Sequence, residues 1–256
     1  MIADKLHKKQ YFISSEVPLL MDLAVNVVST HFTEYPHLRS IKEPSIIDRV
    51  IDKTSVDLPI QITAPHIHHE SYWKKACLSK WKNLRPDDHG WSWKQAYVET
   101  YIQELLMKNT GDAEKYIPEI LACRNYIFFL RIDYLPTHTD LKVLFHHVPN
   151  LSEVAITYGA KHLGDKYERS MFGMRMEDAA SLVECMKVAP CLIHLSLPCN
   201  LIDDELMKML ISGLLSNKTI TQLDLSHNRI GDKGALKLAK YIFRSEILIT
   251  LDLSDN

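Results

Sequence analysis

Residues 219–239 read TITQLDLSHNRIGDKGALKLA, and part of this stretch returns as LITLDLSDN at residues 248–256. The shared residues recur at one constant spacing along the chain. Three sets of positions have this period: Leu195, Leu223 and Leu251; Leu197, Leu225 and Leu253; and Asn200, Asn228 and Asn256. Three aligned copies of one pattern at one fixed period indicate an array of structural repeats.

The residue types within each copy predict one short strand followed by one helix. In a strand of the form Leu-x-Leu the two leucines point to the same side, so they form a buried row when copies stack. The asparagine that follows can pair with backbone groups that the turn would otherwise leave unsatisfied. Apolar residues at helical spacing come next, as in Leu206 and Leu210. Acidic residues at the helix starts are expected to cap free amides, namely Asp203, Asp204 and Asp232.

One strand and one helix in each period are typical of a leucine-rich repeat, and the pattern resembles the ribonuclease-inhibitor-like class. We therefore expect an α/β fold in which a parallel sheet lines the concave face of a solenoid. Two weaker copies, around Leu130 and Val154, bring the expected number of strands to five. Because the gap from Val154 to Leu195 is too long for one plain repeat, an insertion is expected near residues 158–178, before a helix at 179–188.

Composition and charge exclude several classes of function. The 256 residues are 46% hydrophobic and 24% charged, which is typical of a soluble globular protein. The formal net charge of −2 gives no overall attraction to nucleic acid or to a membrane, and neither is expected as a partner. No apolar run is long enough for a transmembrane helix. Five cysteines without CxxC spacing favour a reducing compartment and buried thiols, so a cytosolic or cytoskeletal protein is expected.

The first half of the chain differs from the repeats, because helical segments alternate there with breaks that contain proline. We expect a flexible N-terminus at 1–15, a helical N-terminal domain at 16–126 and the repeats at 127–256. The expected helices lie at 16–32, 44–53, 69–82, 91–108 and 112–123. Four tryptophans predict an aromatic core for this domain: Trp73, Trp81, Trp91 and Trp93. Such a domain can also cover the first apolar face of the repeats.

A basic stretch, YWKKACLSKWKNLR at residues 72–85, has no acidic residue among its five cations: Lys74, Lys75, Lys80, Lys82 and Arg85. One interpretation is a docking surface for an acidic partner, such as the acidic tails of tubulin, with the four lysines as the contacts. The other is the solvated face of an amphipathic helix whose opposite face holds Trp73, Cys77 and Trp81, since charge runs of this length are common on helices.

No set of residues in the sequence is suited to catalysis. The stretch HIHHE at residues 66–70 holds three histidines and a glutamate, but a structural zinc site needs four ligands, and no HExxH or cysteine pair accompanies it. No GxSxG, P-loop or GxGxxG motif is present. Cys199 lies beside a repeat asparagine without an activating base and is expected to be a buried structural thiol. We therefore expect no enzyme activity, no metal and no cofactor.

The repeats also predict an exposed strand surface, formed by the residues that alternate with the buried leucines and line the concave side. From strand to strand these are Glu153, Ala155 and Thr157; His194 and Ser196; Gln222, Asp224 and Ser226; and Thr250, Asp252 and Ser254. This small, polar and mildly acidic face suits a protein partner of basic character. The candidate contacts are Gln222, Asp224, Thr250 and Asp252. The alternative is a solvated face, with binding on the convex side or on the N-terminal domain.

Three segments carry a resemblance to a known family: DLPIQITAPHIHHESYWKKACLSKW at 57–81, HGWSWKQAYVETYIQELL at 89–106 and CRNYIFFLRID at 123–133. They resemble the N-terminal region of the T-complex-associated testis-expressed protein 1 family, which is subunit 5 of the nexin–dynein regulatory complex. The residues that carry the resemblance are Tyr72, Trp73, Cys77 and Trp81; His89, Gly90, Ser92, Trp93 and Lys94; and Cys123 to Tyr126.

The resemblance implies a non-catalytic scaffold subunit of motile cilia and flagella that links doublet microtubules and regulates axonemal dynein. Its expected partners are other subunits of the regulatory complex and the axonemal doublet microtubules, and its expected location is the axoneme. Members of the family carry further repeats, whereas this chain has none after Leu253. We therefore expect a fragment, a short isoform or a truncated gene model.

A protein of a different class remains open. An apolar helix, then YWKKACLSKWKNL, then WSWKQAYVE is an order loosely similar to that of an F-box module. F-box proteins with leucine-rich repeats are substrate adaptors of ubiquitin ligases. An F-box opens with Leu-Pro before its first helix, however, and here Leu58 and Pro59 follow one. A third alternative is a cytosolic leucine-rich-repeat adaptor with neither role.

Overall fold

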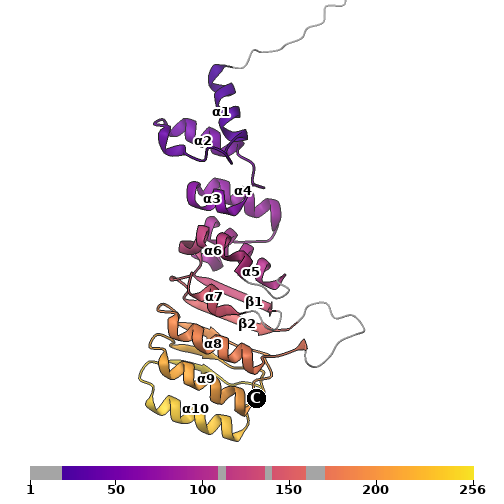
Figure 1. Cartoon of the computed structure of the whole chain (residues 1–256), viewed down its shortest axis with the longest axis vertical. Helices are drawn as coiled ribbons and strands as arrows, with labels where there is room; N and C mark the ends of the chain where they lie inside the picture. The colour runs from indigo at the N-terminus through magenta and orange to yellow at the C-terminus, as the bar shows by residue number, and fades with distance from the viewer. Residues whose placement is uncertain (1–18, 109–113, 136–139, 160–170) are drawn as a thin grey trace, which may run out of the picture. The chain divides into compact units, whose positions relative to one another are not determined.

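The computed structural model of the chain describes residues 19–108, 114–135, 140–159 and 171–256 (Figure 1). The chain divides into two compact units, Met1–Ser55 and Val56–Asn256, each with buried apolar residues of its own. The expected flexible segment at 1–15 lies outside the described residues. None of the helices in the described ranges is long and apolar enough to cross a membrane.

The first unit contains two helices, α1 (Leu20–Thr30) and α2 (Pro44–Lys53), and a short 3-10 helix, η1 (Leu38–Ser40). Proline at the start of α2 costs no hydrogen bond, because amides of the first turn have no acceptor within the helix. Val25 of α1 and Val50 of α2 are almost fully buried. The helix expected at 44–53 has these bounds, whereas the first helix begins at Leu20 within the described residues.

The second unit begins with a helical region. Its helices are α3 (Ile60–His66), α4 (Glu70–Lys80), α5 (Trp93–Met107) and α6 (Ile117–Cys123), with 3-10 turns η2 (Asp87–His89), η3 (Glu114–Tyr116) and η4 (Arg124–Tyr126). The helices expected at 69–82 and 91–108 are confirmed within a few residues by α4 and α5, whereas α6 covers only the second half of the helix expected at 112–123. The sequence does not predict α3, because this helix is only seven residues long and contains Pro65.

Aromatic rings pack between α4 and α5. The ring of Trp73 is almost fully buried and its centroid lies 5.2 Å from that of Tyr97, which in turn lies 5.3 Å from the ring of Trp81. The prediction of four core tryptophans is wrong for Trp91, which is 78% exposed. Gly90 and Trp91 both have positive φ, 61° and 62°. They form the tight turn before α5, so Trp91 is not on the helix that carries the core.

The repeats form a parallel sheet of five strands in the order β1-β2-β3-β4-β5. The strands are β1 (Phe129–Leu135), β2 (Glu153–Tyr158), β3 (His194–Ser196), β4 (Gln222–Asp224) and β5 (Thr250–Asp252). Helices α7 (Leu141–Phe145), α8 (Met176–Val188), α9 (Asp204–Ser216) and α10 (Asp232–Arg244) alternate with them, and α8, α9 and α10 stack side by side (Figure 1). This mixture of helices and parallel strands fits the expected α/β class, and the five expected strands are present.

Residues that lie one repeat period apart in the sequence pair with each other on neighbouring strands of the sheet. Leu195 pairs with Leu223, and Leu223 pairs with Leu251, as Cα partners on neighbouring strands. Leu195, Leu223 and Leu225 are almost fully buried, as the pattern predicts. The prediction of burial is wrong for Leu253, which is 36% exposed. The reason is its place in the sheet, because no strand of the described residues lies beyond β5.

Each repeat asparagine connects its own turn to the preceding repeat. The Oδ1 of Asn228 accepts hydrogen bonds from the amides of Asn200 and Ile202, at 2.9 and 3.0 Å, and its Nδ2 donates to the carbonyl of Leu197 at 2.9 Å. Asn200 makes the corresponding pair of bonds to β2, both 2.7 Å long. Asn256 repeats the pattern at a more exposed site. The predicted role of the asparagines in pairing buried backbone groups is confirmed.

Acidic residues at the helix starts act in two ways. The carboxylate of Asp203 accepts from two amides in the first turn of α9, both at 3.0 Å, and so caps its own helix as predicted. Asp204 instead accepts from the amides of Gly231 and Gly234, at 2.9 and 2.8 Å, so it caps the next helix, α10. The cap predicted from Asp232 is not observed, because Gly231 occupies the N-cap position.

Two boundaries expected from the sequence stay predictions: those of the insertion near residues 158–178, and the one between the helical domain and the repeats. Most of the insertion expected near residues 158–178 falls on residues 160–170, which lie outside the described part. The helix that follows begins at Met176, three residues before its expected start. The boundary expected between residues 126 and 127 lies inside the second unit, where the chain passes from η4 into β1.

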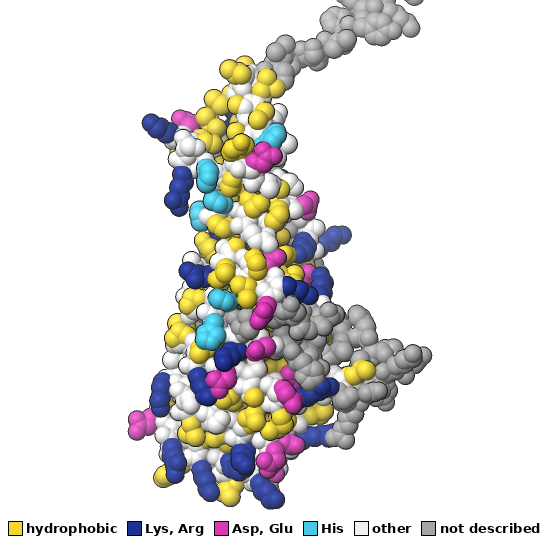
Figure 2. All heavy atoms as spheres, viewed as in Figure 1, with side chains coloured by type: hydrophobic (Ala, Val, Ile, Leu, Met, Phe, Trp, Pro, Cys, Tyr) yellow, Lys and Arg dark blue, Asp and Glu magenta, His cyan; other side chains and the backbone are white. Residues whose placement is uncertain are grey.

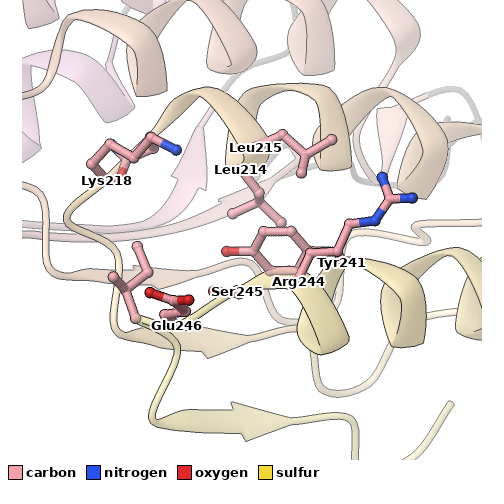
Figure 3. A pocket seen from close by; sticks show the side chains of 9 residues that line it. Leu214, Leu215, Lys218, Tyr241, Arg244, Ser245 and Glu246 are labelled. Carbon is pink, nitrogen blue, oxygen red and sulfur yellow. The ribbon is translucent and has the colours of Figure 1, made fainter.

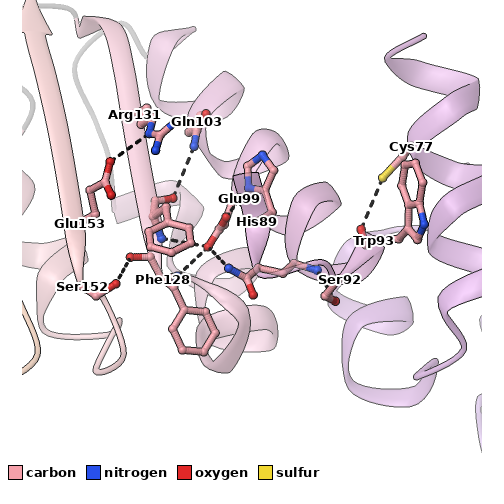
Figure 4. A network of polar contacts seen from close by, with 12 residues as sticks. Cys77, His89, Ser92, Trp93, Glu99, Gln103, Phe128, Arg131, Ser152 and Glu153 are labelled. Carbon is pink, nitrogen blue, oxygen red and sulfur yellow. Dashed lines mark hydrogen bonds and ion pairs between the residues drawn. The ribbon is translucent and has the colours of Figure 1, made fainter. Parts of the chain in front are cut away.

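Two buried charged side chains of α5 connect it to its neighbours, one to the sheet and one to α3. Glu99 of α5 is fully buried, and its Oε1 accepts from the amides of Phe128 and Phe129, at 2.8 and 2.9 Å, where β1 begins (Figure 4). Lys94 of α5 is 2% exposed and donates to two carbonyls at the end of α3, 2.7 and 2.9 Å away. Buried charges need such partners to offset their desolvation. The contacts of Glu99 therefore fix α5 to the first strand, and those of Lys94 fix α5 to the end of α3.

Candidate functional site

The outward face of the parallel sheet brings together the residues expected to bind a partner there. One row across the strands consists of Glu153, His194, Gln222 and Thr250, and the next consists of Ala155, Ser196, Asp224 and Asp252. Gln222 pairs with Thr250 and Asp224 with Asp252, so the four candidate contacts are direct neighbours on β4 and β5. Their role in binding stays a prediction.

Charge changes along this sheet face. On β1 to β3, Arg131 lies 3.0 Å from one carboxylate oxygen of Glu153, and Nδ1 of His194 lies 3.7 Å from the other. No ion pair is formed by Asp224 or Asp252 with another described residue. The face is therefore locally balanced on the first three strands and acidic on the last two.

Hydrogen bonds from serines lower the pKa of both of these aspartates. Burial alone would raise the pKa of Asp224, but hydrogen bonds from the Ser196 hydroxyl (2.7 Å) and from Ser226 outweigh it and lower that pKa. Hydrogen bonds from the hydroxyl and amide of Ser254 likewise lower the pKa of the exposed Asp252. Ser196 and Ser226 are themselves buried, so the expectation that they line an exposed face is wrong. Both donate hydrogen bonds to the carboxylate of Asp224, Ser196 through its hydroxyl and Ser226 through its amide.

The sequence pattern did not single out two further polar residues of this surface. Arg131 pairs in register with Ala155, and the alternation of buried and exposed residues along β1 could have revealed it. His227 follows β4 with φ of 55°, and its Nδ1 lies 3.0 Å from the carboxylate of Asp255. Its position in the turn carries no periodic signal, so sequence alone does not place it on the face.

The structure separates the four lysines of the basic stretch. Lys74 and Lys75 are exposed on α4, and Lys82 is exposed after that helix ends. The ammonium of Lys80 lies 4.4 Å from the ring centroid of Trp81 and 3.8 Å from the carboxylate of Glu104. Burial lowers the pKa of Lys80, and Glu104 partly opposes that effect. Lys80 is thus held against its own unit, and Lys74 also lies near an aromatic ring, with its ammonium 5.7 Å from the ring centroid of Trp93.

The histidine-rich stretch serves structural contacts. Glu70, its last residue, accepts hydrogen bonds from the hydroxyl of Ser92 (2.8 Å) and the amide of Trp93 (2.5 Å) at the start of α5. Nδ1 of His68 lies 3.3 Å from the ammonium of Lys94. In the described ranges, no group of three or more His, Cys, Asp and Glu residues is arranged to hold a metal ion.

The cysteines fall into two groups. Cys77, Cys123 and Cys185 are buried, and burial is the main cause that raises the pKa of each thiol, to about 12 for the first two. A thiol with a raised pKa is a poor nucleophile. Cys191 and Cys199 are exposed, so the expectation of a buried thiol at Cys199 is wrong. Cys199 has φ of 56° and lies in the turn after β3, away from the buried row.

Parallel strands, a buried row of leucines and an asparagine at each turn define a leucine-rich-repeat protein. A family model described as Leucine Rich repeat matches residues 216–239. The Dynein regulatory complex subunit 5 of Chlamydomonas reinhardtii is 34% identical over 201 residues, which cover 74% of this chain and 50% of that protein. The subunits of the same name from Mus musculus and Homo sapiens are each 28% identical over 255 residues, or 88% of this chain and 51% of theirs.

The chain belongs to the dynein regulatory complex subunit 5 family, as the resemblance of its helical region indicates. It spans about half the length of the curated relatives that it matches. The shared region includes the helical part as well as repeats, because an alignment over 88% of the chain must extend beyond the repeats at 127–256.

Proposed function

We propose that the chain acts as a non-catalytic scaffold of a dynein regulatory complex in the axoneme of motile cilia or flagella. The observation that carries this proposal is the similarity to named subunits of that complex, which extends over most of the chain. In this role the chain links doublet microtubules through other subunits and contributes to the regulation of axonemal dynein. Its partners are other subunits of the complex and the doublet microtubules, and no cofactor, metal, nucleic acid or membrane takes part.

The arrangement that we propose for the repeats is a solenoid of the ribonuclease-inhibitor-like class, with the sheet on its concave side. The parallel order of the strands and the stacking of α8, α9 and α10 support it. Such scaffolds bind protein partners over an extended concave face. Two surfaces are candidates for this binding: the sheet residues Gln222, Asp224, Thr250 and Asp252, and the helical-region lysines Lys74, Lys75 and Lys82, with Lys80 beside them.

A fractionation of ciliated cells tests the proposed function. The tagged chain is expressed in a motile ciliated cell, the membrane and matrix are removed with detergent, and the tag is followed through a salt series. We expect retention in the axoneme and release only at high salt, because exposed ion pairs weaken as salt screens them. A full-length relative is tested in parallel as the reference. If only the relative is retained, docking needs parts of the relative that this chain does not cover. If both proteins are lost into the soluble fraction, the proposal is contradicted.

A matched variant and a binding assay refine the result. Charge reversal at Lys74, Lys75 and Lys82 should shift the release of the tag to lower salt if the basic surface of the helical region contacts the complex. Equal release of the variant and the parent assigns docking to another surface. Binding of the chain to the ligase adaptor Skp1 in a pull-down is the outcome expected for an F-box protein, and it would replace the proposal.

A further inference from the structure

Helix α10 carries four cations in one stripe. Lys233, Lys237, Lys240 and Arg244 are spaced i, i+4, i+7 and i+11, which places them on one side of a helix. Lys233, Lys240 and Arg244 are exposed, and the buried residues of α10 lie on another side. In Figure 2 the Lys and Arg side chains gather over α10.

The neighbouring repeats show that the fold does not require this stripe. Helices α8, α9 and α10 are equal in length and begin one repeat period apart, at Met176, Asp204 and Asp232, so each position has an equivalent in the other two. The equivalents in α9 are Glu205, Met209, Ser212 and Ser216, and those in α8 are Glu177, Ser181, Glu184 and Val188. The formal charge of the four positions is −2 in α8, −1 in α9 and +4 in α10.

The cations of the stripe have no partner within the described part of the chain. In α8 and α9, Lys187 pairs with Glu184 at 2.6 Å, and Lys208 pairs with Glu205 at 3.9 Å. No described residue forms an ion pair, a side-chain hydrogen bond or a cation–π contact with the four cations of α10. Four adjacent cations without counterions repel one another and create a positive potential that favours an anionic partner.

A pocket lies at the C-terminal end of this stripe. Its volume is about 220 Å³, and its lining includes Leu214, Leu215 and Tyr241 together with Lys218, Arg244 and Glu246. Figure 3 shows the two leucines and the tyrosine ring between the side chains of Lys218 and Arg244. The pocket thus offers an apolar floor with two cations and one anion at its rim, and Arg244 belongs both to the rim and to the stripe.

We propose that the stripe and the pocket together bind an acidic segment of a protein partner that places one apolar side chain in the pocket. The positive stripe complements carboxylates along the segment, and the apolar floor supplies a contact that a nucleic acid or an array of lipid phosphates would not use. The net charge of −2 over the whole chain gives no general attraction to polyanions, so the attraction of an acidic segment to this surface depends on its local charge. This inference does not depend on the proposed axonemal role.

Fluorescence polarisation with the full chain and a labelled synthetic peptide tests the inference. The peptide consists of glutamates with a single central leucine. The first variant carries K237E, K240E and R244E, and the matched control carries R39E, K42E and K115E, three exposed cations outside both candidate surfaces, with the same change of net charge. We expect the first variant to bind at least about tenfold more weakly and the control within about twofold, because exposed charge pairs contribute modestly but add up. Circular dichroism checks that both variants keep the fold.

A second experiment tests whether the pocket binds the apolar side chain of the peptide. Replacing the central leucine of the peptide by serine should weaken binding several-fold, and the substitution Leu215→Ser in the chain should remove that difference. Leu215 is 48% exposed, so this substitution leaves the core intact. Three results overturn the inference: no saturable binding of the peptide, equal losses in both charge-reversed variants, or tighter binding to vesicles of anionic phospholipid than to the peptide, with the same dependence on α10.

Discussion

Asn228 shows how one amide side chain stabilises two repeats at once. Its oxygen accepts from two amides and its nitrogen donates to three carbonyls, all between 2.9 and 3.0 Å away. Three of these five groups belong to the preceding repeat, at Asn200, Ile202 and Leu197. Because these groups are buried, no water replaces a lost bond. The asparagine is therefore a structural residue and not part of the candidate binding surface.

The substitution Asn228→Ala should lower the free energy of unfolding by about 3 kcal/mol, since several buried backbone groups lose their partners together. Urea denaturation followed by circular dichroism measures the change. Asn256→Ala is the control, because Asn256 makes a similar set of bonds at an exposed site. We expect a loss below about 1 kcal/mol there. Equal losses for the two variants would contradict the explanation by burial.

Lys94 makes stability depend on pH. Burial lowers the pKa of its ammonium from 10.5 to about 8, with Glu70 acting in the opposite direction. Between these two values the unfolded chain binds a proton at Lys94 that the folded chain has lost, so this residue makes stability rise with pH there. Below pH 8 both states are charged, and the full cost of burying the charge is present.

The unfolding free energy of the parent chain minus that of Lys94→Met should therefore increase by about 2–3 kcal/mol from pH 7 to pH 10. Taking the difference removes the contributions of tyrosines, which titrate in both proteins. Urea denaturation in a series of buffers provides the values. A difference that stays constant with pH would show that Lys94 keeps its charge throughout, held by the carbonyls at the end of α3.

The stacking of α8 on α9 depends on a close approach at Gly213. A Cβ atom at this position would lie 3.1 Å from the Cα of Val183 and would also meet the end of Met186. The side chain of Met186 can move, whereas the backbone of α8 at Val183 cannot without separating the helices. The small residue is therefore required by the spacing of the two helices.

The substitution Gly213→Leu should lower the free energy of unfolding by about 2–3 kcal/mol, because overpacking outweighs the gain in helix propensity. Ser212→Leu on the exposed side of the same helix is the matched control and should change stability by less than about 0.5 kcal/mol. Thermal unfolding of both variants gives the comparison. Similar melting temperatures for the two would mean that α8 and α9 are less closely packed than the glycine indicates.

Periodic elements could be predicted from the sequence, and elements set by tertiary contacts could not. The constant period predicts the strands at Leu195, Leu223 and Leu251 and their register, because strand pairing repeats the sequence period. The helix α3 is too short for a periodic signal, and its end is held by Lys94, which is far from Ala64 in the sequence. Exposure of Trp91 likewise depends on a turn that begins with a positive φ at Gly90.

The candidate binding surfaces could likewise be predicted from the sequence only in part. Alternation along the strands places Gln222, Asp224 and their partners on the outward face, whereas the burial of Ser196 and its hydrogen bond to the next strand are seen only in the structure. A run of lysines can be read from the sequence, but the contact of Lys80 with Trp81 and Glu104 requires two helices in place. Sequence therefore identifies the surface, and the structure identifies which charges on it are available.

The division of the chain at Ser55 and Val56 has a direct consequence for stability. The second unit contains the aromatic cluster, the buried charges Glu99 and Lys94, and all five strands. The first unit has its own buried residues and its own ion pair, between Arg49 and Asp22. Units with separate cores can unfold separately.

A chain of residues 56–256 should therefore fold without residues 1–55, with a free energy of unfolding within about 1 kcal/mol of that of the same unit in the full chain. Urea denaturation followed through tryptophan fluorescence isolates this unit, because all four tryptophans lie within it. The full chain, observed by circular dichroism, should show an additional helical transition from residues 19–55. A large loss of stability in the shortened chain would mean that the two units share a core and unfold as one.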